Sequence, residues 1–301
     1  MSSRRQSLLP VIAILMMIGC TDRNPAGADG TITPTGDNGV TGDKGGATGD
    51  GVVAKKDGGG STGDVGALGK FSFFVTSLKA LRDLSKNQNG FGGDLSYGET
   101  GAGAGLRGAD KICTEIAERS MAGAGKKVWR AFLSATNDGS GKVANAIDRI
   151  GSGPWYDRQG RLFGKSIVDI SATRPTSADA AIKNDFPNED GVPNHSPDGV
   201  QVDNHDMLTG SNAQGKLYGQ SATCKDWTGK AGSEGKPRVG HSWPRGGGGG
   251  GGGGEAAHWI SAMDVGGCAP GVNLSDSMGG GGNTVGGEGG YGGFYCFALT
   301  P

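Results

Sequence analysis

Residues 105–120 read GLRGADKICTEIAERS, and this stretch predicts the helix around which the domain is built. Its apolar residues recur at spacings of three, four and seven, which is the repeat of one helix face. These residues are Leu106, Ala109, Ile112, Cys113, Ile116 and Ala117. Because the charged residues fall elsewhere, Cys113 is expected to point into the core.

Short runs of aromatic and β-branched residues accompany this helix. They predict strands at 71–76, 128–133, 155, 162–163, 216–219, 257–261 and 294–299. A second, shorter helix is expected at 143–150, and residues 171–205 have the composition of a loop. A few strands, two early helices and long loops predict a small α+β domain with much irregular structure.

The composition limits the possible domains and partners. Of 301 residues, 63 are glycine and only 34% are hydrophobic, and the glycines concentrate in stretches that cannot build a core. One folded domain is therefore expected, over 71–301. The net charge is -1, and no long run of Lys and Arg occurs. Since nucleic-acid binding needs clustered positive charge, nucleic acid is excluded as a partner.

The first twenty residues, MSSRRQSLLPVIAILMMIGC, have the plan of an export signal. Two arginines precede an apolar run at 8–18, which is too short to span a bilayer, because spanning takes about 20 residues. The end of this run resembles a bacterial lipobox, which implies that Cys20 is diacylated and begins the mature protein. We expect a signal peptide at 1–19 and membrane attachment through Cys20. The alternative is an ordinary cysteine behind a plain signal peptide.

Thr21 follows the predicted lipid-bearing cysteine, and the absence of Asp at that place indicates the outer membrane. Residues 20–70 carry too few apolar side chains to offset an ordering entropy of about 1–2 kcal/mol per residue. A disordered tether is therefore expected there. Glycine tracts at 246–254, 279–282 and 286–293 lie between segments predicted to fold, and each is expected to be an expanded surface loop.

Four cysteines remain in the predicted domain, namely Cys113, Cys224, Cys268 and Cys296. Export places them in an oxidising compartment, where an even number indicates two disulfides. Their spacing leaves all three pairings open. No two lie within four residues of each other, so the pattern of a zinc ribbon or finger is missing.

Four segments resemble endostatin, the C-terminal domain of collagens XV and XVIII. They are 105–113 (GLRGADKIC), 129–134 (WRAFLS), 219–227 (GQSATCKDW) and 292–298 (GGFYCFA). Their order holds over 71–301. The resemblance implies the C-type-lectin-like fold. It also implies that Cys113 pairs with Cys296 and that Cys224 pairs with Cys268.

The segment 184–215 has no Lys or Arg and is rich in Asp, Asn and Gly. Hard oxygen ligands on a flexible loop suit Ca²⁺. The predicted calcium ligands are Asp190, Asp198, Asp203 and Asp206. The alternative is a solvated acidic loop, because neither the spacing of an EF-hand nor the sugar-binding triplets of lectins are present.

The four histidines form no HExxH pattern. His195 and His205 lie in the acidic segment and are candidates for a metal site. His241 and His258 flank the glycine tract at 246–254, and they are expected to be surface or turn residues.

Two tryptophans, Trp227 and Trp243, lie among polar and loop residues. They are expected to be exposed and are the candidates for ligand binding. No GxSxG elbow is present, and the domain cysteines are expected to be paired, so no catalytic residue is assigned.

Together these features predict a lipid-anchored extracytoplasmic recognition or adhesion module. Its expected ligand is an envelope or extracellular polysaccharide, or a protein partner. One alternative is an enzyme on the same fold with a metal-dependent site near His205 and Asp206. A cluster of histidines and carboxylates with a deep pocket would favour the enzyme. The other alternative is a purely structural envelope lipoprotein.

Overall fold

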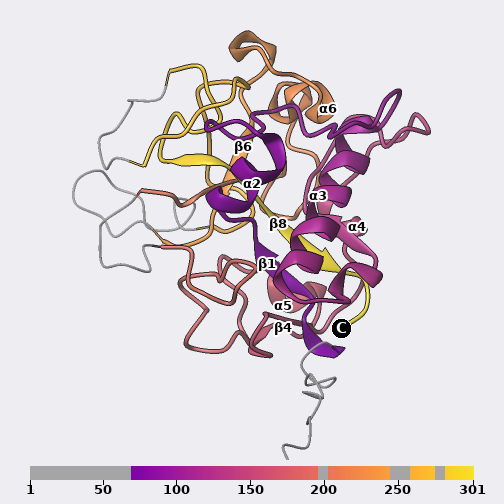
Figure 1. The fold of residues 1–301 in the computed structure, drawn as a ribbon, viewed down its shortest axis with the longest axis vertical. Coiled ribbons are helices and arrows are strands. Elements are labelled where there is room, and N and C mark those ends of the chain that lie inside the picture. The colour runs from indigo at the N-terminus through magenta and orange to yellow at the C-terminus, as the bar shows by residue number, and fades with distance from the viewer. Residues whose placement is uncertain (1–68, 196–202, 245–257, 275–281) are drawn as a thin grey trace, which may run out of the picture. The chain divides into compact units, whose positions relative to one another are not determined.

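The structure is a computed structural model that describes residues 69–195, 203–244, 258–274 and 282–301 (Figure 1). All of these residues belong to one unit of the chain, 60–301. The predicted signal peptide, Cys20 and nearly all of the predicted tether lie outside the described residues. The same holds for Asp198 and for the glycine tract at 246–254.

The central element is β8 (Gly290–Ala298), which is buried along its whole length. Its second half pairs antiparallel with β1 (Phe73–Val75) and β2 (Trp129–Ala131). Its first half pairs parallel with β5 (Asp206–Leu208), and the sheet continues through β6 (Arg238–His241) and β7 (Met263–Asp264). Figure 1 shows β8 in yellow beside β1 and α3. One closing strand thus joins segments from every part of the domain.

The helices lie outside this sheet and are mostly short. They are α2 (Leu78–Ser85), α3 (Ala104–Ser120), α4 (Ala146–Arg149), α5 (Ile167–Ile170) and α6 (Cys224–Trp227), with single 3₁₀ turns at Ala124–Lys126, Gln220–Thr223 and Gly232–Glu234. A separate hairpin pairs β3 (Trp155–Tyr156) with β4 (Leu162–Gly164). Among the described residues, no helix is both long enough and apolar enough to cross a membrane.

The expected α+β class is confirmed, and so are the helix at 105–120 and the first and last strands. Two predicted strands are wrong. Residues 216–219 form an irregular turn in which Leu217 alone bridges to Ser211. Residues 258–261 are a loop that buries Trp259 and Ile260 without strand pairing. At 258–261 the apolar side chains are covered by other segments, so their burial needs no strand. At 216–219 Leu217 is half-buried and Tyr218 is 50% exposed, so no buried face holds a strand there.

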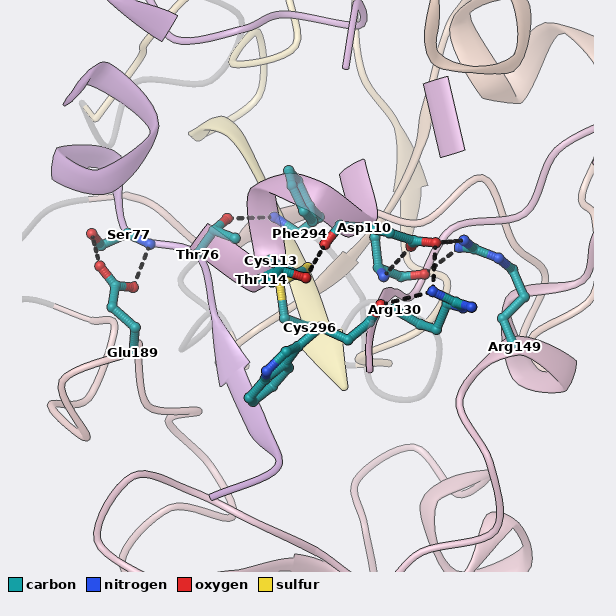
Figure 2. Close-up of a disulfide and its surroundings, with 12 residues drawn as sticks. Thr76, Ser77, Asp110, Cys113, Thr114, Arg130, Arg149, Glu189, Phe294 and Cys296 are labelled. Atoms are coloured by element: carbon teal, nitrogen blue, oxygen red, sulfur yellow. Dashed lines mark hydrogen bonds and ion pairs between the residues drawn. A yellow bond between two sulfur atoms is a disulfide. The ribbon is translucent and has the colours of Figure 1, made fainter. Parts of the chain in front are cut away.

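Two disulfides staple the domain, and both pairs are those that the resemblance implies. Cys113 in α3 bonds to Cys296 in β8 across 183 residues of chain (Figure 2). Cys224 bonds to Cys268 across 44 residues. The periodicity of α3 explains the first pair, because Cys113 lies on the apolar face that packs toward the sheet.

A half-buried ion-pair network lies beside the first disulfide (Figure 2). Asp110 in α3 accepts hydrogen bonds from Arg149 at 2.8 and 2.9 Å and from the backbone N–H of Ala131 at 2.9 Å. Arg130 adds an ion pair at 3.3 Å. Burial raises the pKa of the Asp110 carboxyl, although Arg149 opposes that shift. The network ties α3 to β2 and α4.

The glycine tract at 286–293 is not the surface loop that was expected. Its residues are buried or half-buried, and its second half is the start of β8. A Cβ on Gly286 would lie 2.6 Å from the carbonyl oxygen of Gly290, and one on Gly293 would lie 2.8 Å from Sδ of Met207. Glycine is needed here because neighbouring segments approach too closely for a side chain.

Residues Cys224–Trp227 form a left-handed turn, with φ of 46°, 53°, 54° and 65°. Such a conformation costs about 1–2 kcal/mol for each L-residue. Backbone and side-chain groups of the loop that follows β2 hold it in place. Asp226 accepts hydrogen bonds from the backbone and the hydroxyl of Thr136, both at 2.6 Å, and the Trp227 indole donates to Ser134 O at 2.8 Å.

Candidate metal centre

The pairing of β5 with β6 places two potential metal ligands opposite each other. Asp206 opens β5, His241 closes β6, and the two are direct register partners. Directly opposed residues project to the same face, with Cβ atoms about 4.5–5.5 Å apart. His205 precedes β5, where strand alternation does not apply, and its ring lies 4.1 Å from the His241 ring at an interplanar angle of 85°.

Three ligand atoms converge at this point. Nε2 of His205 lies 3.3 Å from Oδ1 of Asp206, and Nε2 of His241 lies 3.2 Å from the same oxygen. Every pair of the three atoms is within 4.8 Å. The exposed fractions of the residues are only 1%, 1% and 4% for His205, Asp206 and His241.

Among the described residues, the Asp206 carboxylate has two imidazole neighbours but no hydrogen bond. Within the described part of the chain, neither of its oxygens accepts a hydrogen bond. An unsatisfied buried polar group costs about 1–3 kcal/mol, and a charged one costs more. A cation at the convergence point would satisfy Asp206 and use the imidazole nitrogens that face it.

A second carboxylate orients one of these imidazoles. Asp203 forms a short hydrogen bond with Nδ1 of His205 and is itself 3% exposed. When Nδ1 carries the proton, Nε2 presents its lone pair toward Asp206 and His241. Carboxylate–histidine–metal arrangements of this kind fix the ring and raise its basicity as a ligand.

The spacing and the donor set fit a transition metal. Tetrahedral coordination with bonds of about 2.0–2.1 Å places neighbouring ligand atoms about 3.3–3.4 Å apart. The two distances to Asp206 Oδ1, 3.3 and 3.2 Å, are close to that edge length. Two imidazoles with one carboxylate suit zinc or ferrous iron. Ca²⁺ instead takes about six to eight oxygen ligands, so this donor set does not fit calcium.

The cluster is enclosed on one side by Gly289, which precedes β8, and by Gly290, which begins it. A Cβ on Gly289 would lie 2.6 Å from Cγ of Asp203, and one on Gly290 would lie 3.0 Å from Cβ of Asp206. On another side, Trp243 lies 5.3 Å from the His205 ring and stacks on His195 at 3.7 Å. The glycine tract therefore makes room for the two carboxylates.

The four predicted calcium ligands do not form one group. Asp203 and Asp206 are buried in the histidine cluster, whereas Asp190 is exposed in the turn that follows Asn188. Asp198 lies outside the described residues. In the sequence, the neighbouring residues His205 and Asp206 already indicated a candidate metal site here.

His241 was missed, and so was its role in the cluster. The expectation of a surface or turn histidine is wrong for His241, which is buried and ends β6. The only local signal was a histidine at the end of a short apolar run. Its partner Asp206 is 35 positions earlier (241 − 206) and meets it only through strand pairing.

The expected exposure of the two tryptophans is also wrong. Trp227 is completely buried, and its indole N–H is satisfied by Ser134. Trp243 is 8% exposed and donates to Asn204 Oδ1 at 2.9 Å. Trp243 therefore covers the cluster of His205, Asp206 and His241 and does not offer an open face for a ligand to stack on.

A hollow of about 520 Å³ lies elsewhere, between α3, β2 and α4, and it carries three arginines. Their guanidinium groups are engaged within the protein. Arg149 binds Asp110, Arg130 also pairs with Asp110, and Arg107 binds Glu99 and two carbonyl oxygens. This hollow is therefore a poor anion site.

Comparison with known proteins gives no further constraint on function. The chain matches no protein-family model, and no curated protein is significantly similar to it. What the domain does has to be inferred from the site itself.

Proposed function

We propose that this protein is an exported, lipid-anchored recognition or adhesion module whose binding end is organised by a divalent transition metal at His205, Asp206 and His241. The observation that carries the metal is the convergence of three buried donor atoms on one point. Zinc is the ion that best suits the spacing. The proposed ligand of the module is an envelope or extracellular polysaccharide, or a protein partner.

The metal has a structural role in this proposal. It joins β5 to β6 and to the loop before β5, and it neutralises Asp206. Trp243 and His195 pack over the cluster from two further loops, so the same ion holds several loops in one arrangement. A rigid arrangement of loops lowers the entropic cost of binding a ligand.

A metal-dependent enzyme is the second candidate. Three protein ligands with a further position open is the arrangement of catalytic zinc sites. Against it, all three ligands are buried, and the hollow of about 520 Å³ is lined by none of them. Their burial favours an ion that shapes the binding end over one that meets a substrate.

We also propose the endostatin-like, C-type-lectin-like fold for the domain and the outer membrane as its location. The two disulfide pairs support the fold, because they are the pairs that the resemblance implies. The export signal and lipobox at 1–20 support attachment through Cys20. An oxidising compartment is consistent with both disulfides.

The test is the metal content of the mature protein extracted from the native envelope in detergent. Mass spectrometry of the metals is expected to find about one zinc ion per chain, lost in His241→Ala and retained in the control Asp190→Asn. A protein that carries no transition metal and is not stabilised by added zinc would contradict the proposal. If the protein instead binds calcium, and Asp190→Asn removes that calcium, the calcium site predicted from the sequence is supported.

A glycan array then separates recognition from catalysis. The metal-loaded protein is expected to retain glycans without cleaving them, and chelator is expected to abolish retention. Cleavage of a retained glycan would favour the enzyme.

A further inference from the structure

The metal ligand His241 has a cationic neighbour. Arg174 follows α5, and its Nη1 donates to the carbonyl oxygen of His241 at 2.7 Å and to that of Ser242 at 3.3 Å. Its guanidinium carbon lies 4.7 Å from the ring centre of Phe186. These contacts fix the guanidinium plane at the end of β6.

The other two nitrogens of this guanidinium are not used. Nε and Nη2 of Arg174 are shielded from solvent, and neither has a hydrogen-bond partner in the part of the chain that the structure describes. Burial lowers the pKa of Arg174 to about 10, so the group is still a cation at neutral pH. A shielded cation with unused donors is costly unless an anion accompanies it.

The two unused donors lie on one edge of the guanidinium. In arginine, the N–H of Nε and one N–H of Nη2 point in parallel, while Nη1 is on the far side. Two parallel donors match the two oxygens of a carboxylate or phosphate, which is the geometry of bidentate recognition. Nη1 donates to the carbonyl oxygens of His241 and Ser242, whereas no described residue accepts a hydrogen bond from the other edge.

We propose that the free edge of Arg174 binds an oxyanion of the ligand, held by Nε and Nη2 beside the metal-bearing end of β6. The inference rests on the proposed recognition function in assigning the anion to the ligand, and it names the ligand as acidic. Carboxylate sugars or peptides and phosphorylated or sulfated groups share this chemistry. The oxyanion is enclosed, because both donors are shielded from solvent.

Two internal groups, Tyr295 and Asp185, interact electrostatically with Arg174. The Tyr295 hydroxyl donates to the carbonyl oxygen of Trp259 at 2.9 Å, so Asp185 is the competing carboxylate. Its carboxylate interacts electrostatically with Arg174, but its Oδ1 accepts from the backbone N–H of His195 at 3.0 Å. Burial raises the pKa of Asp185. In this structure Asp185 therefore serves the loop that carries His195, and no described residue accepts a hydrogen bond from the Arg174 edge.

The experiment measures thermal unfolding of the mature, detergent-extracted protein in acetate, phosphate, sulfate or chloride at matched ionic strength. At least one of the first three anions is expected to raise the midpoint above that in chloride. A rise of the midpoint in acetate alone indicates a carboxylate on the ligand. A rise in phosphate or sulfate indicates a phosphorylated or sulfated group. Arg174→Lys keeps the charge without the fork, and its affinity for the active anion should fall about tenfold.

Three results would overturn the proposal. One is the absence of any anion effect beyond chloride in the wild type. Another is an equal effect in Arg174→Lys, which would mark general salt stabilisation. The third is an acetate effect that appears only in Asp185→Asn, because Asp185 would then be the true partner. If Arg174→Lys does not fold, the Nε–H resonance of wild-type Arg174 is followed instead, and it must shift with the active anion.

Metal content separates this inference from the metal site. Arg174→Lys should retain its zinc while losing the anion effect. An anion effect in protein that binds no metal would support the Arg174 site and contradict the metal site alone.

Discussion

Replacement of Asp206 by Asn distinguishes a metal site from an ordinary buried polar cluster. In chelator, no metal ion lies beside the Asp206 carboxylate. Wild-type Asp206 then carries a charge at 1% exposure and accepts no hydrogen bond from the described residues. Asn has the same size and no charge, so the variant should unfold with a free energy higher by about 1–3 kcal/mol.

Zinc should reverse the order of stability, so that the wild type becomes more stable than Asp206→Asn. An ion at 1,000 times its dissociation constant adds about 4.1 kcal/mol to a folded state that alone binds it. The wild type gains this stabilisation and the variant does not. The variant should then be less stable than the wild type by about 1–3 kcal/mol, the difference between that gain and the cost removed.

The assay is urea unfolding of the oxidised mature protein, followed by tryptophan fluorescence in chelator and in zinc. Asp190→Asn is the matched control, because Asp190 is exposed in the same acidic segment. Its effect should stay within about 0.5 kcal/mol in both conditions. The metal site is refuted if Asp206→Asn changes the unfolding free energy by one and the same amount with and without zinc.

Three further predictions concern the surroundings of this site and the staples of the domain. Asp203→Asn should weaken zinc binding about 10–100-fold in a competitive chelator titration, because the hydrogen bond to His205 no longer fixes that ring; unchanged affinity would exclude the orienting role. Replacing both cysteines of one pair by serine should lower the free energy of unfolding, by about 5 kcal/mol for Cys113–Cys296 and about 4 kcal/mol for Cys224–Cys268. The difference follows from chain entropy over separations of 183 and 44 residues. A larger loss for the second pair, measured by denaturant unfolding, would contradict this. Burial raises the pKa of Glu189 above its usual 4.5, so its contribution to stability is full below that pH and is lost as pH rises through the raised pKa. In urea unfolding at a series of pH values, Glu189→Gln should therefore flatten the dependence of the unfolding free energy on pH over that window. A steeper dependence in the variant would show that the pKa of Glu189 is lowered in the folded protein.

The sequence predicted the parts of the fold that local patterns specify. The apolar face at 105–120 and the aromatic runs at 71–76 and 294–299 depend on neighbours within a few residues. The resemblance to endostatin predicted the disulfide pairs, which spacing alone had left open. The short strands β5 and β6 were not predicted, because three or four residues with Gly, Asp and His carry no period that marks a strand.

The cluster of His205, Asp206 and His241 could be predicted only in part. His205 and Asp206 are neighbours in the chain, so a shared site was visible. His241 joins them through the register of β5 and β6, and local sequence does not specify which strands pair. The left-handed turn at Cys224–Trp227 was hidden for a similar reason, since tertiary hydrogen bonds offset its local strain.

By itself, the sequence determined the α+β class and the inward-facing helix that carries Cys113, because both follow from local periodicity and composition. Only the tertiary structure decided which glycines are buried and which histidine meets Asp206. It also decided that one edge of Arg174 meets no acceptor among the described residues. These features depend on contacts between segments far apart in the chain, where packing and strand register override local preference.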